Sequence, residues 1–279
     1  MNKQIVSNPW RVLNQFTDAR IGLGRAGGSL PTEELLKFQL AHARARDAVH
    51  QPLDIADLVS QLGSISDQLP HLKEALTSQA NDRISYLQRP DLGRKLNEAS
   101  INYLKQQVDV ITERAAIAQS FDLAIVIVDG LSSTAVQTNA SPLIAQLFSA
   151  LNEERLEWSI APLVLVTQGR VAIGDEIGAL MHARAVLVLI GERPGLSSPD
   201  SLGIYLTHDP QPGRTDAQRN CISNVRPGGL SYSEACNRTL YLLREARRLG
   251  LSGVQLKDRS DENVIEHQSS NFLLDDSSG

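Results

Sequence analysis

Glycines and polar side chains follow three short aliphatic runs in the second half of the chain. They occupy residues 129–133, 167–171 and 191–195. Glycine lets backbone amides and carbonyls approach a ligand closely, while Arg170, Glu192 and Arg193 offer directed hydrogen bonds. For any one of these residues, pairing with a neighbouring charge at a strand end is the alternative role. Because the pattern occurs three times, we expect a binding site for a large ligand with polar edges.

The aliphatic runs determine where these polar segments would lie. Residues 123–128, 162–166 and 185–190 show no alternation of polar and apolar side chains, which is typical of strands buried on both faces. Helices are expected between them at residues 141–151 and 175–182, so the pattern is βαβαβ and predicts a parallel sheet. Residues 202–207 are a further candidate strand. The ligand crevice of such a sheet lies outside the carboxyl ends of the strands, where the polar segments would meet.

The rest of the chain divides into regions of different composition. Residues 1–31 contain several glycines and two prolines and predict an extended arm, and a helix is expected to begin at Thr32. Residues 32–118 have a helical pattern, interrupted by a basic, polar segment at 82–94 that we interpret as a structured loop. A Rossmann-like domain would occupy residues 119–258 and end in a helix at 233–249, with Gly250 as its C-cap. The tail at 259–279 is rich in serine and aspartate, and we expect it to be disordered.

The predicted fold class is therefore α/β, with a helical N-terminal region followed by a Rossmann-like parallel sheet and flanking helices. Apolar residues make up 42% of the 279 residues and aromatic residues 4%, so the core is expected to be large and aliphatic. The net charge of -5, without long blocks of like charge, disfavours a nucleic acid or an anionic membrane as partner. Cys221 and Cys236 form neither a CxxC motif nor a disulfide framework, which fits a reducing cytoplasm. No apolar run approaches the length that spans a bilayer, and the N-terminus has no signal-peptide pattern, so we expect a cytoplasmic protein.

Common catalytic signatures are missing from the sequence. Residues 22–27 match G-x-G-x-x-G, but no aliphatic run precedes them and Pro31 separates them from the next helix, so their context argues against a dinucleotide site. The sequence has no G-x-S-x-G elbow, P-loop or HExxH motif. Cys221 would need a nearby base to act as a nucleophile, and we interpret it as a buried, inert thiol.

The same segments carry a resemblance to a known family. Residues 17–27, 82–94, 128–132, 169–171, 191–195 and 220–224 resemble, in this order, the small subunit of ethanolamine ammonia-lyase, and the resemblance spans about residues 8–258. It implies a light chain that clamps adenosylcobalamin together with a larger, barrel-type subunit, which carries the substrate. The complex would convert ethanolamine to acetaldehyde and ammonia by a radical rearrangement, and this chain would not be active alone. The family also implies a cytoplasmic location, either free or within a bacterial microcompartment.

Carried over residue by residue, the resemblance implies cobalamin contacts at Val171, Glu192 and Cys221, with no catalytic or metal-ligating residue in this chain. Glu192 could accept hydrogen bonds from amide or hydroxyl groups of the cofactor, and Val171 and Cys221 could offer backbone groups and apolar contact. Some cobalamin proteins supply an axial histidine from an Asp-x-His-x-x-Gly motif, but no histidine here has an aspartate two residues before it. We therefore expect the cofactor to keep its own dimethylbenzimidazole as the lower ligand.

Two other functions fit the residues. One is a self-sufficient α/β enzyme that binds a nucleotide cofactor at the carboxyl ends of the strands, and it would bind that nucleotide tightly without a partner. The other is a purely structural subunit of an assembly. A cofactor-clamping subunit differs from both, because the chain alone would bind cobalamin poorly and catalyse nothing.

Overall fold

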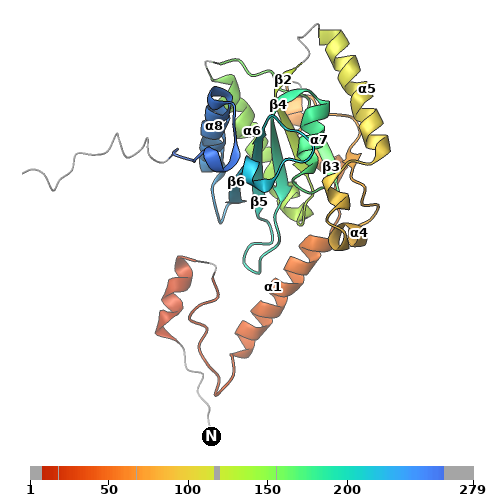
Figure 1. Cartoon of the computed structure of the whole chain (residues 1–279). Coiled ribbons are helices and arrows are strands. Elements are labelled where there is room, and N and C mark those ends of the chain that lie inside the picture. Colours follow the sequence, from red (N-terminus) through yellow and green to blue (C-terminus); the bar gives the residue numbers. More distant parts are fainter. Residues whose placement is uncertain (1–7, 18, 67, 116–119, 155, 261–279) are drawn as a thin grey trace, which may run out of the picture.

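The computed structural model of the chain describes residues 8–17, 19–66, 68–115, 120–154 and 156–260 (Figure 1). It is an α/β structure in which one sheet is covered by helices, as the sequence predicts. Residues 1–7 of the expected arm and all but the first two residues of the expected tail lie outside the described residues.

A six-stranded sheet with the order β1-β3-β2-β4-β5-β6 forms the centre of the fold. Its strands are β1 (Leu76–Thr77), β2 (Phe121–Val128), β3 (Val164–Thr167), β4 (Ala183–Gly191), β5 (Leu202–His208) and β6 (Arg219–Val225). The first four strands in this order are parallel, whereas β5 pairs antiparallel with both β4 and β6. The parallel arrangement predicted for the strands at β2, β3 and β4 is confirmed, and β5 alone runs in the opposite direction. No helix crosses between β4 and β5, and a strand that returns without a crossover pairs antiparallel.

Two layers of helices cover the two faces of the sheet. Helices α6 (Ser133–Asn152) and α8 (Tyr232–Leu249) pack on one face, and α7 (Ile173–Leu180) packs on the other, next to α5 (Glu98–Ala115). Alternate residues of β2 divide between two separate apolar clusters, one on each face. This burial on both faces explains the continuous aliphatic run in the sequence.

Local signals account for the ends of these helices. The Ser132 hydroxyl accepts a hydrogen bond from the backbone of Ala135 and caps α6, which begins well before the predicted residue 141 and contains Pro142 in its interior. Helix α8 starts in a capping box between Ser231 and Glu234. It ends at Gly250, whose φ of 68° is the left-handed cap that the sequence predicts.

The segment before β2 is more varied than its helical pattern indicates. It contains α1 (Thr32–His50), α2 (Ile55–Gln61), α3 (Gly63–Ser66), α4 (Arg83–Gln88), the short 3-10 helix η2 (Leu92–Arg94) and α5. Strand β1 also lies in this segment and joins the sheet beside β3. The basic stretch at 82–94, predicted as a loop, therefore includes a helix and a 3-10 turn. The start of α1 at Thr32 is as predicted.

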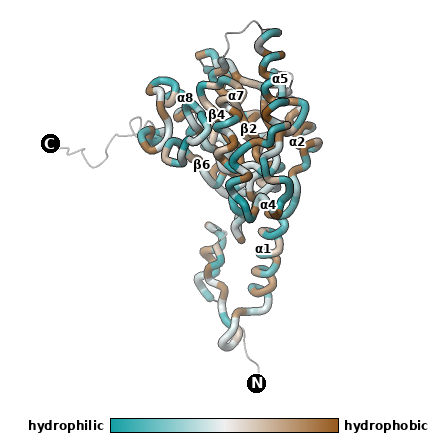
Figure 2. Tube along the Cα trace, turned by 45° about the vertical axis from the view of Figure 1, so that its right-hand side comes forward, coloured by the Kyte–Doolittle hydropathy of each residue, from teal (hydrophilic) through white to brown (hydrophobic). Residues whose placement is uncertain are grey.

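The described part of the N-terminal arm and most of α1 project away from the body of the molecule (Figure 1). The 3-10 helix η1 (Pro9–Gln15) lies beside α1 and is linked to it by Arg11, which hydrogen-bonds Glu34. Many large apolar side chains in this region are exposed, and Figure 2 shows the hydrophobic colouring on η1 and α1. They are Trp10, Val12, Leu13, Phe16, Ile21, Leu30, Leu35, Leu36, Phe38 and Leu40.

The glycine-rich motif at residues 22–27 lies in this arm. The backbones of Ala26 and Ser29 bridge across a turn there, and α1 begins only at Thr32. Because a dinucleotide fingerprint must join a buried strand directly to a helix, this position does not support one. No helix among the described residues is long and apolar enough to cross a membrane.

Candidate functional site

The carboxyl ends of β2, β3 and β4 meet at one edge of the sheet. The chain leaves β2 toward α6 on one face and leaves β3 toward α7 on the opposite face. Loops that diverge in this way open a crevice between neighbouring strands, which is where ligands bind in open α/β sheets. The three polar segments singled out in the sequence are the loops at this edge.

The loops after β2 and β4 contact each other through their backbones. The amide of Leu131 donates a hydrogen bond to the carbonyl of Gly191, with 2.9 Å between the nitrogen and the oxygen. A Cβ atom on Gly191 would lie 2.0 Å from the carbonyl oxygen of Ser132. A Cβ atom on Gly130, whose φ is 59°, would lie 2.3 Å from the Gly191 oxygen. Only glycine at both positions allows this approach.

Asp129 fixes the loop after β3. It is buried, and its carboxylate accepts hydrogen bonds from the amides of Gln168 at 2.8 Å and Gly169 at 3.1 Å. Burial raises the pKa of this carboxyl group, while the two amides and Arg83, 3.6 Å away, act in the opposite direction. Asp129 therefore has a structural role, because it holds the backbone of the loop after β3 in place.

Tyr86 in α4 also holds the loop after β3 in place. Its ring is fully buried between two guanidinium groups, with Arg83 4.7 Å and Arg170 4.1 Å from the ring centroid. Its hydroxyl donates to the carbonyl of Gly169 at 3.0 Å, and Arg170 donates to the carbonyl of Tyr86 at 3.0 Å. Burial raises the pKa of Tyr86, so the hydroxyl stays protonated and can donate. We call Arg83, Tyr86 and Arg170 the arginine–tyrosine stack.

A pocket of about 400 Å³ opens above this stack at the carboxyl end of β4. Among the residues that line it are Val171 and Glu192, two of the three contacts implied by the resemblance, and also Arg170 and Arg193. Leu131, Ile190 and Tyr205 provide apolar and aromatic surface. The structure thus brings Val171 and Glu192, which are distant in sequence, to one pocket that combines an apolar wall with a polar edge.

The carboxylate of Glu192 is already hydrogen-bonded within the chain. The hydroxyl of Ser201 and the amide of Asn224, at 3.2 Å, donate to one oxygen, and the hydroxyl of Ser223 donates to the other at 2.5 Å. Glu192 therefore links the end of β4 to β5 and β6. Each carboxylate oxygen has two lone pairs, so Glu192 keeps limited capacity to accept a further hydrogen bond from a ligand.

Cys221 is exposed, whereas the sequence analysis predicted a buried thiol. It lies inside β6. In the sheet it pairs with Tyr205 of β5, which does line the pocket. Desolvation raises the pKa of its thiol, and the nearby carboxylate of Glu192 raises it further, whereas a hydrogen bond with Tyr205 lowers it. The thiol is therefore accessible but mainly protonated at neutral pH.

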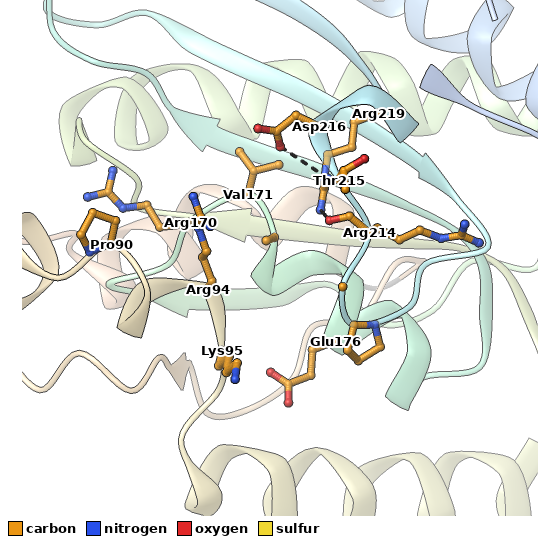
Figure 3. A pocket seen from close by; sticks show the side chains of 13 residues that line it. Pro90, Arg94, Lys95, Arg170, Val171, Glu176, Arg214, Thr215, Asp216 and Arg219 are labelled. Atoms are coloured by element: carbon orange, nitrogen blue, oxygen red, sulfur yellow. Dashed lines mark hydrogen bonds and ion pairs between the residues drawn. The ribbon is translucent and has the colours of Figure 1, made fainter. Parts of the chain in front are cut away.

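A second pocket, of about 810 Å³, continues from the first, because Arg170 and Val171 line both (Figure 3). Its other wall comes from the segment at 90–95 and from the loop before β6. Five basic side chains and two carboxylates line it. They are Arg94, Lys95, Arg170, Arg214, Arg219, Glu176 and Asp216.

Buried charges stabilise the wall of this second pocket. Arg219 forms ion pairs with the buried Asp175 and, at 3.4 Å, with Asp216. Burial raises the pKa of Asp175 to about 6, and the Arg219 guanidinium opposes that shift. Arg214 is paired with Asp209 at 2.6 Å. Arg214 and Arg219 thus have carboxylate partners within the chain.

Sequence reasoning missed several residues of this site. Arg83, Tyr86 and Arg94 lie in the stretch at 82–94, whose basic and polar character was noticed but which no strand-end rule connects to the sheet. Tyr205 lies within a strand and gives no signal in the sequence. Their positions depend on tertiary contacts that composition does not reveal.

Comparison with known proteins identifies the family. The sequence-family model of the ethanolamine ammonia-lyase light chain matches residues 7–257. The chain belongs to this family.

Relatives in the light-chain family match over nearly the whole chain. The ethanolamine ammonia-lyase small subunit of Pseudomonas fluorescens strain Pf0-1 is 53% identical over 273 residues, which cover 96% of this chain and 95% of the relative. That of Ralstonia nicotianae strain GMI1000 is 51% identical over 271 residues, covering 97% and 96%. That of Pseudomonas aeruginosa strain UCBPP-PA14 is 53% identical over 273 residues, covering 96% and 94%. As a member of the light-chain family, the chain is a subunit of a lyase.

Proposed function

We propose that this chain holds adenosylcobalamin in the crevice at the carboxyl ends of β2, β3 and β4, against a large subunit that carries the substrate. The assembled enzyme converts ethanolamine to acetaldehyde and ammonia, and the small subunit alone is inactive. The observation that carries the proposal is the pocket that joins Val171 and Glu192 at the edge of the sheet where such folds bind ligands. The larger pocket continues from it through Arg170 and Val171.

The residues of the crevice fit a cofactor of this size and chemistry. Cobalamin combines a broad, largely apolar ring with amide side chains and a nucleotide tail. The two pockets, about 400 and 810 Å³, offer apolar surface from Val171, Ile190 and Leu131 next to hydrogen-bonding groups.

Each of the three implied contact residues has a role in binding or orienting the cofactor. Val171 contributes apolar contact and backbone groups at the junction of the two pockets. Glu192 holds β4, β5 and β6 together and offers one carboxylate edge to the cofactor. Cys221 lies one strand further out and acts through its neighbour Tyr205 or at the edge of the bound ring. When bound, the cofactor supplies radical chemistry from its cobalt–carbon bond, and the protein orients and encloses it.

Co-purification with the large subunit tests this proposal. The tagged chain, produced together with the large subunit of the same enzyme, is expected to retain it, and the complex is expected to bind adenosylcobalamin and release ammonia from ethanolamine. The chain alone should bind the cofactor at least tenfold more weakly and show no turnover. If the chain alone bound a nucleotide tightly, or if the complex formed without any affinity for the cofactor, the proposal would be wrong.

A further inference from the structure

Arg83 joins three segments that are distant from one another in the sequence. Its Nε atom donates a hydrogen bond to the carbonyl of Val49 in α1, with 2.6 Å between the nitrogen and the oxygen. Its Nη1 atom donates to the carbonyl of Gly130 after β2 at 2.9 Å and to the side-chain oxygen of Gln168 after β3 at 3.4 Å. Arginine can serve several acceptors at once, because its N–H donors are fixed in one plane. One guanidinium group therefore connects the end of α1 with two loops of the crevice.

The contact with Val49 holds the end of α1 that lies against the body of the molecule. Val49 is the last residue but one of α1, so its carbonyl has no partner within the helix, and the C-terminal end of a helix favours a cation. Figure 1 shows this end of α1 next to α4, the helix that begins with Arg83. Within α1 only Glu34 and Ala48 are buried, and Glu34 is held by side chains of the arm and of α1 itself. The hydrogen bond from Arg83 is therefore a large part of the attachment of α1 to the body.

On its other side, Arg83 reaches a strained loop. Gln168 has a φ of 56°, in the left-handed region that is unfavourable for a residue with a side chain. Such a conformation persists only where the surrounding contacts hold it. Arg83 holds the side chain of Gln168, and Asp129, which lies 3.6 Å from the guanidinium, accepts the amide of the same residue. Without Arg83 the loop after β3 would lose one of these two restraints.

Arg83 is not itself a wall of the crevice. It lines neither pocket, and its side chain is only 14% exposed. Leu131, which directly follows Gly130, and Val171, three residues after Gln168, do line the pocket at the end of β4. Arg83 therefore acts on a bound ligand only through the loops that carry these two residues.

We propose that Arg83 is a positioning residue that couples the placement of α1 to the shape of the cofactor crevice, an inference that rests on the proposed function. The guanidinium can bond to Val49 and Gly130 together only while α1 and the loop after β2 keep their present separation. A displacement of α1 therefore either breaks a hydrogen bond of a largely buried cation or pulls the loop with it. Any movement of the arm that tilts α1 reaches Leu131 and Val171 by this route.

A double-mutant cycle in the assembled complex tests the coupling. Arg83→Met keeps an apolar stem but removes the donors, and Ala48→Leu overfills the buried contact at the end of α1. The affinity for adenosylcobalamin is measured by spectroscopic titration of the complex of both subunits, with either substitution or with both. Arg89→Met is the matched control, because Arg89 directly follows the same helix, is paired with Asp91 and lines neither pocket.

Arg83→Met is expected to weaken cofactor binding about tenfold, as for loss of a hydrogen bond from a charged group, and Arg89→Met should leave it unchanged. Ala48→Leu should weaken binding about threefold or more by displacing the end of α1. The double variant should bind no more weakly than Arg83→Met, because the route from α1 has already been cut. Two effects that multiply, or unchanged affinity in either single variant, would overturn the inference while leaving the proposed function intact. A wild-type complex that binds no adenosylcobalamin would remove both.

Kinetics separates positioning from a general loss of structure. Arg83→Met should raise the KM for adenosylcobalamin and retain kcat for ethanolamine at saturating cofactor, because Arg83 lines neither pocket. A fall in kcat that saturating cofactor does not restore would give Arg83 a purely structural role and refute the coupling. If Arg83→Met subunits do not assemble, Arg83→Lys takes their place in the same cycle with the same criterion, since a single ammonium cannot bond to α1 and to both loops at once.

Hydrogen exchange of the empty complex, followed by mass spectrometry, locates the effect. Arg83→Met should raise the exchange of backbone amides at residues 168–171 and at the end of α1, and leave α8 unchanged. Faster exchange throughout the chain would mean that the substitution destabilises the whole fold, and would overturn the assignment.

Discussion

The arginine–tyrosine stack makes Tyr86 the most informative position for mutagenesis. Tyr86→Phe removes the hydroxyl that donates to Gly169 over 3.0 Å and leaves the ring between Arg83 and Arg170. A buried carbonyl that loses its donor costs about 1–3 kcal/mol. Tyr86→Leu also loses the two guanidinium–ring contacts, at roughly 1 kcal/mol each, so its total cost should be about 3–5 kcal/mol.

Urea denaturation of the full chain, followed by circular dichroism, measures these free energies of unfolding. Tyr241→Phe is a matched control, because Tyr241 packs against the apolar cluster on the other face of the sheet and its hydroxyl makes none of the hydrogen bonds found in the described part of the chain. Tyr86→Phe should also weaken cofactor binding by the complex, since the loop that carries Val171 loses a support. If Tyr86→Phe cost no more stability than Tyr241→Phe, the role assigned to the hydroxyl would be refuted.

Three other substitutions test the site. Glu192→Ala should weaken cofactor binding by the complex by about 1–3 kcal/mol in titrations. It should also lower the stability of the free chain, because three internal hydrogen bonds are lost. Unchanged cofactor affinity would leave Glu192 a purely structural role. Cys221→Ser should retain turnover, because the radical chemistry needs no thiolate from this subunit. The raised pKa of the Cys221 thiol, ordinarily 9.0, predicts slow alkylation by iodoacetamide at pH 7 that accelerates only above pH 9, and rapid labelling at pH 7 would contradict it. Arg219→Met should destabilise the chain by about 3–5 kcal/mol by leaving Asp175 buried without its cation, and adding Asp175→Leu should restore most of that loss in urea denaturation.

The sequence predicted the parts of the fold whose pattern is local. Strands β2, β3 and β4 were found because burial on both faces produces continuous aliphatic runs. Strand β1 has only two residues and leaves no pattern, and β6 reads Arg-Asn-Cys-Ile-Ser-Asn-Val, too polar for a buried strand because it lies at the edge of the sheet. The start of α6 was placed too late because Pro142 looks like a first-turn proline, although the helix continues through it.

The candidate site was predictable where it follows strand ends and unpredictable where it depends on distant segments. Val171 and Glu192 follow β3 and β4, so the topology rule places them at one edge. Cys221 was predicted to be buried and is exposed, because the edge strand β6 that contains it was not recognised. Tyr86 and Arg94 reach the site through the pairing of β1 with β3, and no local rule connects a basic segment near residue 90 with a loop near residue 170.

That pairing also has a consequence for the order in which the molecule forms during synthesis. Thr77 of β1 and Thr167 of β3 are 90 residues apart in sequence, and the Arg170 side of the arginine–tyrosine stack depends on the same pairing. Until residue 169 has been synthesised, the hydroxyl of Tyr86 has no Gly169 carbonyl to donate to. The binding crevice is therefore completed only after β3 has emerged. A nascent chain halted before β3 could form the early helices but would contain neither pocket.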